Sequence, residues 1–327
     1  MRKMIIRADD VGYTEVCNIG TFQAIDGGMV TSADVMLDGF GAVDALERLK
    51  NYPWLSIGWH MHMWCSPVLP EEQVSSLIEK EGPFAGRFRL DLPAAQDVSY
   101  DEALAELTAQ LDRCLAILGR VPDTGNAGNP DTPYGRAVNT VNARYGIPTG
   151  YAARAASDPR VLKKVRDAQA AGEKWAQYYI AKERAFTPAA AEWADRKIVI
   201  LDGSLPYMDL YTDSIGRVED TYDPVLYYTE DRAGILNYPE DVITEQSWHP
   251  GFVDYTVYRC GERGKRPRAQ QFVVGRTQDV AALTDDRLRE WIRNNQIELV
   301  NFRDAMYGTR SFQNHLKETR SSLAVSV

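Results

Sequence analysis

Short apolar segments alternate with longer amphipathic segments along most of this 327-residue chain. Apolar runs that stop at glycine or charged residues predict strands near residues 4–8, 29–36, 55–63, 147–151, 197–201, 242–247 and 297–301. Three- and four-residue apolar spacing predicts helices near residues 14–26, 100–118, 136–145, 159–192 and 285–295. About seven strands, most of them followed by a helix, indicate an α/β protein with a parallel sheet.

Repeated β-α units of this length fit either a closed barrel or an open doubly wound sheet, and periodicity does not separate the two. No linker rich in glycine, proline or serine divides the chain, and no internal repeat is visible. We therefore expect one domain over residues 1–306, followed by a polar tail over residues 307–327.

Composition excludes several classes of function. The net charge of −9 and the pI of about 5.1 argue against nucleic acid and anionic membranes as partners. No apolar run approaches the length of a membrane span, and the N-terminus lacks a secretory signal, so we expect a cytoplasmic protein. The scattered cysteines predict free thiols, and motifs for phosphate loops, dinucleotide binding or serine hydrolases are missing.

Three polar motifs follow predicted strands, where parallel α/β enzymes hold their sites. The first is Asp9-Asp10 at the end of the first strand. Either these carboxylates belong to a site, or Asp10 or Thr14 caps the next helix. Because neighbouring side chains of a strand diverge, Asp9 and Asp10 are not expected to bind one ion equally.

The second motif is His60-Met61-His62 at the end of the third strand. Side chains two residues apart on a strand share a face, so the two imidazoles can point into one space. Such a pair beside a carboxylate predicts a metal site. The third motif, Trp248 to Asp254, holds His249 before a Pro-Gly turn, where the histidine either serves a site or bonds to backbone.

These motifs, together with Gly28 to Ser32 and the closing segments at 283–284 and 301–303, resemble in their order the YdjC-like carbohydrate deacetylases, which include chitooligosaccharide deacetylases. The resemblance covers roughly residues 1–306 and implies a distorted β/α barrel of the deacetylase type. It also implies a divalent metal and removal of acetyl groups from N-acetylated amino sugars. By the same resemblance Asp9 is the general base, Asp10 and His60 are metal ligands, and His249 assists the leaving group or the oxyanion.

One segment departs from the family pattern. Family members carry a histidine-rich stretch that supplies the third metal ligand, whereas residues 122–133 read PDTGNAGNPDTP here. An oxygen of Asn126, Asn129 or Asp131 could replace that histidine, with Asn129 the first choice, or His62 could supply a nitrogen. Zn²⁺ is the expected metal, with Mg²⁺ or Mn²⁺ favoured if the third ligand is an amide oxygen.

The sequence thus predicts a metal-dependent hydrolase that removes an N-acyl group from an amino sugar or oligosaccharide. Trp64, Trp248 and Asp254 lie beside the motifs and are expected to contact a small carbohydrate substrate, although aromatic residues serve core packing as often. The altered ligand set leaves two alternatives, a non-hydrolytic enzyme on the same barrel and an inactive sugar-binding homologue. The oligomeric state is open, with a homodimer as one option.

Overall fold

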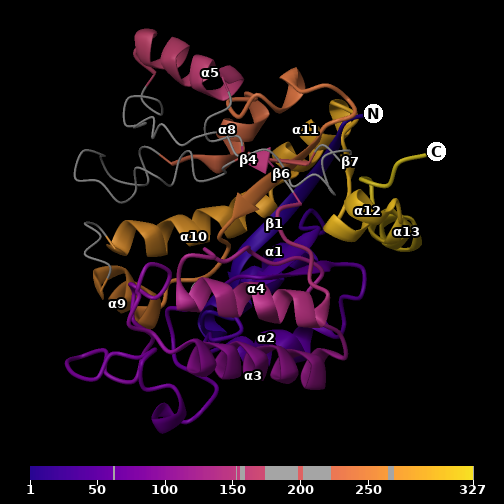
Figure 1. The fold of residues 1–327 in the computed structure, drawn as a ribbon. Coiled ribbons are helices and arrows are strands. Elements are labelled where there is room, and N and C mark those ends of the chain that lie inside the picture. The colour runs from indigo at the N-terminus through magenta and orange to yellow at the C-terminus, as the bar shows by residue number, and fades with distance from the viewer. Residues whose placement is uncertain are drawn as a thin grey trace.

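The computed structural model describes residues 1–61, 63–151, 153–154, 159–173, 198–201, 222–263 and 269–326. Its centre is a parallel sheet in the order β3-β2-β1-β6-β5-β4, and β7 pairs with the start of β1. The strands are β1 (Lys3–Val11), β2 (Ser32–Val35), β3 (Ser56–Trp59), β4 (Ala153–Arg154), β5 (Ile198–Leu201), β6 (Ile243–Trp248) and β7 (Glu298–Leu299). The sheet curls into part of a barrel (Figure 1).

Helices surround this sheet (Figure 1). They are α1 (Glu15–Asp26), α2 (Ala42–Leu49), α3 (Tyr100–Leu118), α4 (Pro133–Tyr145), α5 (Pro159–Ala170), α8 (Pro224–Thr229), α9 (Tyr255–Arg263), α10 (Ala269–Leu283), α11 (Asp286–Asn294), α12 (Phe302–Tyr307) and α13 (Ser311–Glu318). Short 3-10 helices cover Glu71–Gln73 and Ile235–Asn237. No helix in the described ranges is long and apolar enough to cross a membrane.

Apolar side chains on both faces of β1 pack in hydrophobic clusters. In β1, Met4 and Ile6 pack in the cluster beneath α1 and α2, while Ile5 belongs to a second cluster on the opposite side of the strand. Burial on both faces is typical of a parallel strand between helices and a barrel interior. Arg7 follows this apolar stretch of β1, and its side chain pairs with Asp9 at the site.

Helix ends follow the capping rules. Thr14 caps α1, because its hydroxyl accepts from the Cys17 amide. Ser99 caps α3 in the same way, and Gly119 ends that helix with a φ of 78°. Since Thr14 performs the capping before α1, the Asp10 carboxylate is left for other contacts.

Several predicted elements differ from the structure. Residues 147–151 are not a strand, and β4 lies further on at 153–154. The helix expected over 159–192 covers 159–170, and its remainder beyond residue 173 lies outside the described residues. Helices α9 and α10 were not predicted, and the segment expected to be a polar tail contains α13, whose Phe312 and Leu316 are buried.

Candidate functional site

The end of β1 departs from regular strand geometry at its two aspartates. The register between β1 and β2 shifts between Ala8 and Val11, and Asp10 has a φ of 59°, in the left-handed region that few non-glycine residues adopt. Such a bulge breaks the alternation of side chains along a strand. Asp9 and Asp10 therefore both approach His60, contrary to the expectation that their side chains diverge.

Asp10 is held from two sides. Its Oδ1 lies 2.9 Å from His60 Nε2, and its Oδ2 is paired with the Arg276 guanidinium of α10. The Asp10 side chain is 2% exposed and that of Arg276 is fully buried. Burial alone would raise the pKa of Asp10, but Arg276 and His60 hold this pKa well below its ordinary value.

Asp9 is paired with Arg7, two residues earlier on the same strand. Arg7 Nε lies 2.6 Å from Asp9 Oδ1, and its Nη2 lies 3.0 Å from Oδ2. His249 Nε2 lies 3.9 Å from the same Oδ2. Burial opposes ionisation of Asp9, but Arg7, His60 and His249 lower its pKa below the ordinary value, so Asp9 is a carboxylate at neutral pH.

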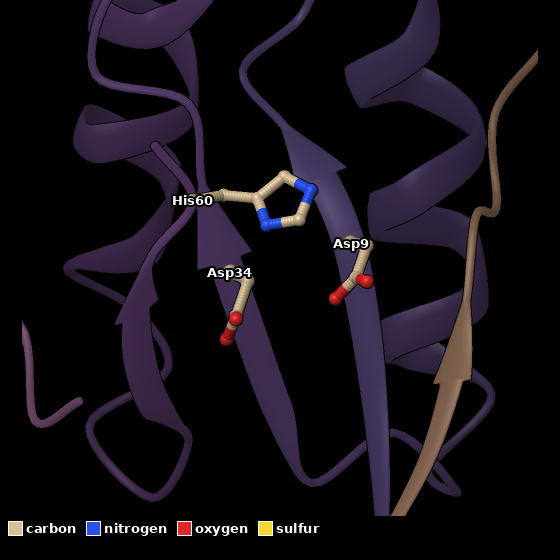
Figure 2. A group of neighbouring side chains, drawn as sticks. All are labelled: Asp9, Asp34 and His60. Carbon is tan, nitrogen blue, oxygen red and sulfur yellow. The ribbon is translucent and has the colours of Figure 1, made fainter. Parts of the chain in front are cut away.

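Asp34 is a site residue that the sequence analysis missed. It lies on β2, close to Asp9 and His60. The distances between one carboxylate oxygen of Asp34, one carboxylate oxygen of Asp9 and one ring nitrogen of His60 are all within 4.8 Å. Figure 2 shows the two carboxylates on neighbouring strands, with the His60 ring beside them. A carboxylate between Ala33 and Val35 inside a predicted strand was the available signal, since buried aspartates are rare without a partner.

Arg7 joins Asp34 and Glu245 to this cluster. Its Nη1 lies 3.4 Å from Asp34 Oδ2, and its Nε lies 3.3 Å from Glu245 Oε1 on β6. Burial raises the pKa of Asp34 to about 6 and that of Glu245 to about 8, although Arg7 opposes both shifts. At neutral pH Glu245 therefore holds its proton, whereas Asp34 is ionised. Burial lowers the pKa of His60, but Asp9 and Asp10 raise it above its ordinary value, so the cluster favours a positive charge at this place.

His249 is fixed by contacts of the turn in which it lies. Its amide donates to Asp279 Oδ2 of α10 at 2.8 Å, and the Thr21 hydroxyl of α1 donates to the Pro250 carbonyl at 2.7 Å. A side chain at Gly20 would collide with the Gly251 backbone, so the turn packs directly on α1. Burial lowers the pKa of His249, with Asp10 opposing, so its imidazole is neutral at neutral pH.

The predicted third ligands are exposed or lie outside the described residues. Asn129 is exposed in the loop before α4, and its Oδ1 accepts from the Asp131 amide at 3.0 Å. Asn126 is also exposed. His62 lies outside the described residues. The ligand roles of Asn129 and His62 stay predictions.

The predicted substrate-contacting residues have different environments. Trp64 is half-buried, and its ring lies 6.1 Å from that of Tyr13. Trp248 is 2% exposed and stacks on Tyr228 at 4.7 Å, as a core residue does. Asp254 Oδ1 accepts from the Val257 amide at 2.9 Å, at the start of α9.

The donor set fits a divalent ion. Asp10 Oδ1 and His60 Nε2 already face each other, while the Arg276 guanidinium is paired with the other Asp10 oxygen. Asp34 Oδ1 is buried with no hydrogen-bond partner among the described residues, as expected for an oxygen reserved for another contact. Carboxylate oxygens with one imidazole nitrogen suit Zn²⁺ or Mn²⁺.

This chain is an α/β protein whose parallel strands carry carboxylates and histidines at their carboxyl ends. Enzymes of the α/β class hold their active sites at the same place. The chain belongs to the YdjC-like protein family, whose profile matches residues 3–294. The family resemblance seen in the sequence is thereby confirmed.

Named relatives agree with that assignment. A carbohydrate deacetylase of Brevibacillus brevis is 26% identical over 301 residues, which cover 92% of this chain and 98% of the relative. A chitooligosaccharide deacetylase of Serratia marcescens is 32% identical over 119 residues, 36% of this chain and 46% of that protein. The crystal structure of an Enterococcus faecalis protein named for cellobiose-phosphate cleavage has a TM-score of 0.58 and 20% identity, covers 93% of this chain and 98% of its own, and shares the fold.

Proposed function

We propose that this protein is a metal-dependent carbohydrate deacetylase that hydrolyses an N-acetyl group of an amino sugar or oligosaccharide. The observation that carries the proposal is the buried cluster in which Asp9, Asp10 and His60 converge at the strand ends. The relatives named carbohydrate deacetylase support the substrate class. A distorted barrel of about seven strands and a single catalytic domain over residues 1–306 belong to the same proposal.

We assign Asp10, His60 and Asp34 to the metal. The first two face each other at 2.9 Å, and Asp34 offers a buried oxygen near His60. A divalent ion held there would polarise the acyl carbonyl and lower the pKa of a bound water. Asn129 and His62 remain the competing third ligands from the sequence analysis.

Asp9 then serves as the general base. Its lowered pKa keeps it ionised, and Arg7 fixes both of its oxygens, so it can accept the proton of the attacking water. His249, neutral and half-buried close to Asp9, donates a hydrogen bond to the developing oxyanion or to the leaving nitrogen. The proton held by Asp9 is then available for the departing amine, which leaves as the free amino sugar.

Trp64 is half-buried and lies beside the buried ring of Tyr13, which is 5.6 Å from the Arg276 guanidinium. Aromatic faces of this kind stack on the apolar faces of sugars. We propose Trp64 as the substrate contact and retain the cytoplasmic location as a prediction.

Acetate release from N-acetylated chitooligosaccharides, with and without a chelator, tests the function. Acetate formation that a chelator abolishes and added Zn²⁺ or Mn²⁺ restores is the expected result. A different product from the same sugars indicates the non-hydrolytic alternative, and binding without turnover indicates the inactive homologue.

A further inference from the structure

Arg276 joins the centre of the site to a helix near the other end of the chain. It lies 266 residues from Asp10 in sequence, yet its guanidinium pairs with Asp10 Oδ2. Its side chain is fully buried, in a protein interior where an unpaired charge is strongly destabilising. This contact is therefore specific to the folded site and is not a surface ion pair.

Helix α10 is itself fixed against the two loops that carry the polar motifs. The Arg276 carbonyl accepts from the Gly251 amide at 3.3 Å, in the turn that follows His249. One turn further along α10, Asp279 accepts from the His249 amide at 2.8 Å. The Arg276 guanidinium also lies 5.6 Å from the Tyr13 ring, after β1. One face of α10 thus holds the segments after β1 and β6 together.

The two oxygens of Asp10 have different partners. Arg276 takes Oδ2, and Oδ1 faces His60 Nε2 at 2.9 Å. A carboxylate with a single partner can rotate, and Asp10 also sits on a backbone at φ 59° that costs free energy to maintain. A guanidinium on Oδ2 stops that rotation and keeps Oδ1 turned toward His60.

We propose that Arg276 is a positioning residue for this site, which orients the Asp10 carboxylate so that Oδ1 and His60 Nε2 together bind the metal. The proposal rests on the metal site proposed above. Arg276 donates no ligand and takes no proton, and its effect on the metal passes through Asp10. Partners that orient a metal ligand in this way typically change metal affinity by about 10- to 100-fold when they are replaced.

The test compares metal affinity in Arg276→Gln, Arg276→Lys and the wild-type protein, by titration of the metal-free proteins with Zn²⁺ and by the visible absorption spectrum with Co²⁺. Arg276→Gln is expected to weaken Zn²⁺ binding by about 10-fold or more and to alter the Co²⁺ spectrum. Arg276→Lys, which keeps the charge but loses the planar fork, is expected to recover part of the affinity. Guanidinium ion added to Arg276→Ala is expected to recover part of the Zn²⁺ affinity as well.

Two variants serve as controls. Arg287→Gln replaces an exposed arginine of α11 that pairs with Asp285, and it is expected to bind metal as the wild type does. Asp279→Asn disturbs the α10 contact to His249 and leaves Arg276 in place, so it is expected to weaken Zn²⁺ binding less than Arg276→Gln does. Equal or tighter Zn²⁺ binding by Arg276→Gln overturns the proposal.

A double-mutant cycle of melting temperatures, measured on the metal-free protein, separates this inference from the proposed function. If Arg276 acts through Asp10, the melting temperature of Arg276→Gln with Asp10→Asn lies close to that of the more destabilised single variant. Additive losses overturn the inference even if the wild type binds metal. A wild type that binds no metal overturns the metal part of the proposed function, and the cycle then decides the role of Arg276 alone.

Discussion

Gly58 and Asp34 face each other across β3 and β2, and the Asp34 carboxylate fills the space that a side chain at Gly58 would need. The glycine before Trp59 and His60 is thus explained by a contact that the sequence did not reveal. Asp34 lies between Gly58 on one side and the Arg7 guanidinium on the other, with an oxygen close to His60.

Gly58→Ala is expected to weaken metal binding by about 10-fold or more, because the new methyl group must displace the Asp34 carboxylate. Titration of the metal-free variant with Zn²⁺ measures this. Gly28→Ala is the matched control, since a side chain there enters open space away from the site and costs only backbone strain at a φ of 80°. Wild-type affinity in Gly58→Ala would mean that Asp34 does not contribute to the metal.

The third ligand is identified by comparing Asp34→Asn with Asn129→Ala and His62→Ala. We expect Asp34→Asn to lose metal affinity and Asn129→Ala to retain it, because the Asn129 side chain is exposed and bonded within its own turn. Elemental analysis of proteins purified without chelator measures the retained metal. Loss of metal in Asn129→Ala or His62→Ala, with full retention in Asp34→Asn, would support the ligand predicted from the sequence.

Asp9→Asn is expected to lower kcat by on the order of 10² or more while metal remains bound, since the amide does not accept the proton of water. The substitution also leaves Arg7 short of one carboxylate partner, so the melting temperature is recorded alongside the rate. A normally folded variant with near-normal kcat would refute the role of Asp9 as general base.

Stability is expected to fall as pH rises from about 5 to 8 in the metal-free protein. Burial raises the pKa of Glu245 from 4.5 to about 8 in the folded state, so the folded protein binds this proton more tightly than the unfolded chain does. That contribution to stability is complete below the unfolded value and is lost as pH rises through the folded one. Asp34, whose pKa burial raises to about 6, adds to the loss in the lower part of this range.

Glu245→Gln is expected to flatten this dependence by up to about 1.4 kcal/mol per pH unit in the free energy of unfolding. Urea unfolding at several pH values measures the slope. Glu47→Gln on α2, an exposed position, is expected to leave the slope unchanged. Equal slopes in the wild type and Glu245→Gln would show that Glu245 ionises without cost in the folded protein.

Apolar spacing and capping residues predicted the helices whose ends are determined by neighbouring residues. The helix expected over 100–118 is α3, since Ser99 and Gly119 mark its ends. Its buried face differs from the leucine pattern, because Glu106 and Gln110 are buried while Leu115 is 43% exposed. The Glu106 carboxylate accepts hydrogen bonds from the amides of Val68 and Leu69. Periodicity does not reveal this contact between distant segments.

The site was predictable in its motifs and not in its geometry. Asp9 and Asp10 lie near the end of β1, His60 and His249 directly follow β3 and β6, and the parallel sheet brings the four together. The bulge at Asp10 and the contribution of Asp34 depend on pairing between strands, so no local pattern predicted them.

The two arginines of the site were missed for a related reason. Arg7 lies in a predicted strand, and Arg276 lies in a helix that the sequence analysis did not predict. Arg7 is half-buried and Arg276 fully buried, and each is paired with a carboxylate that neutralises it. Their partners are close in space and, for Arg276, far apart in sequence.

Chelator-dependent acetate release tests the central claim most directly. The purified protein is incubated with N-acetylated chitooligosaccharides, and acetate is measured before chelation, after chelation and after Zn²⁺ or Mn²⁺ is restored, with Asp10→Ala and His60→Ala in parallel. The account predicts acetate release that is lost on chelation, returns with metal and is absent in both variants. Acetate release that is unaffected by chelation and persists in both variants would contradict it.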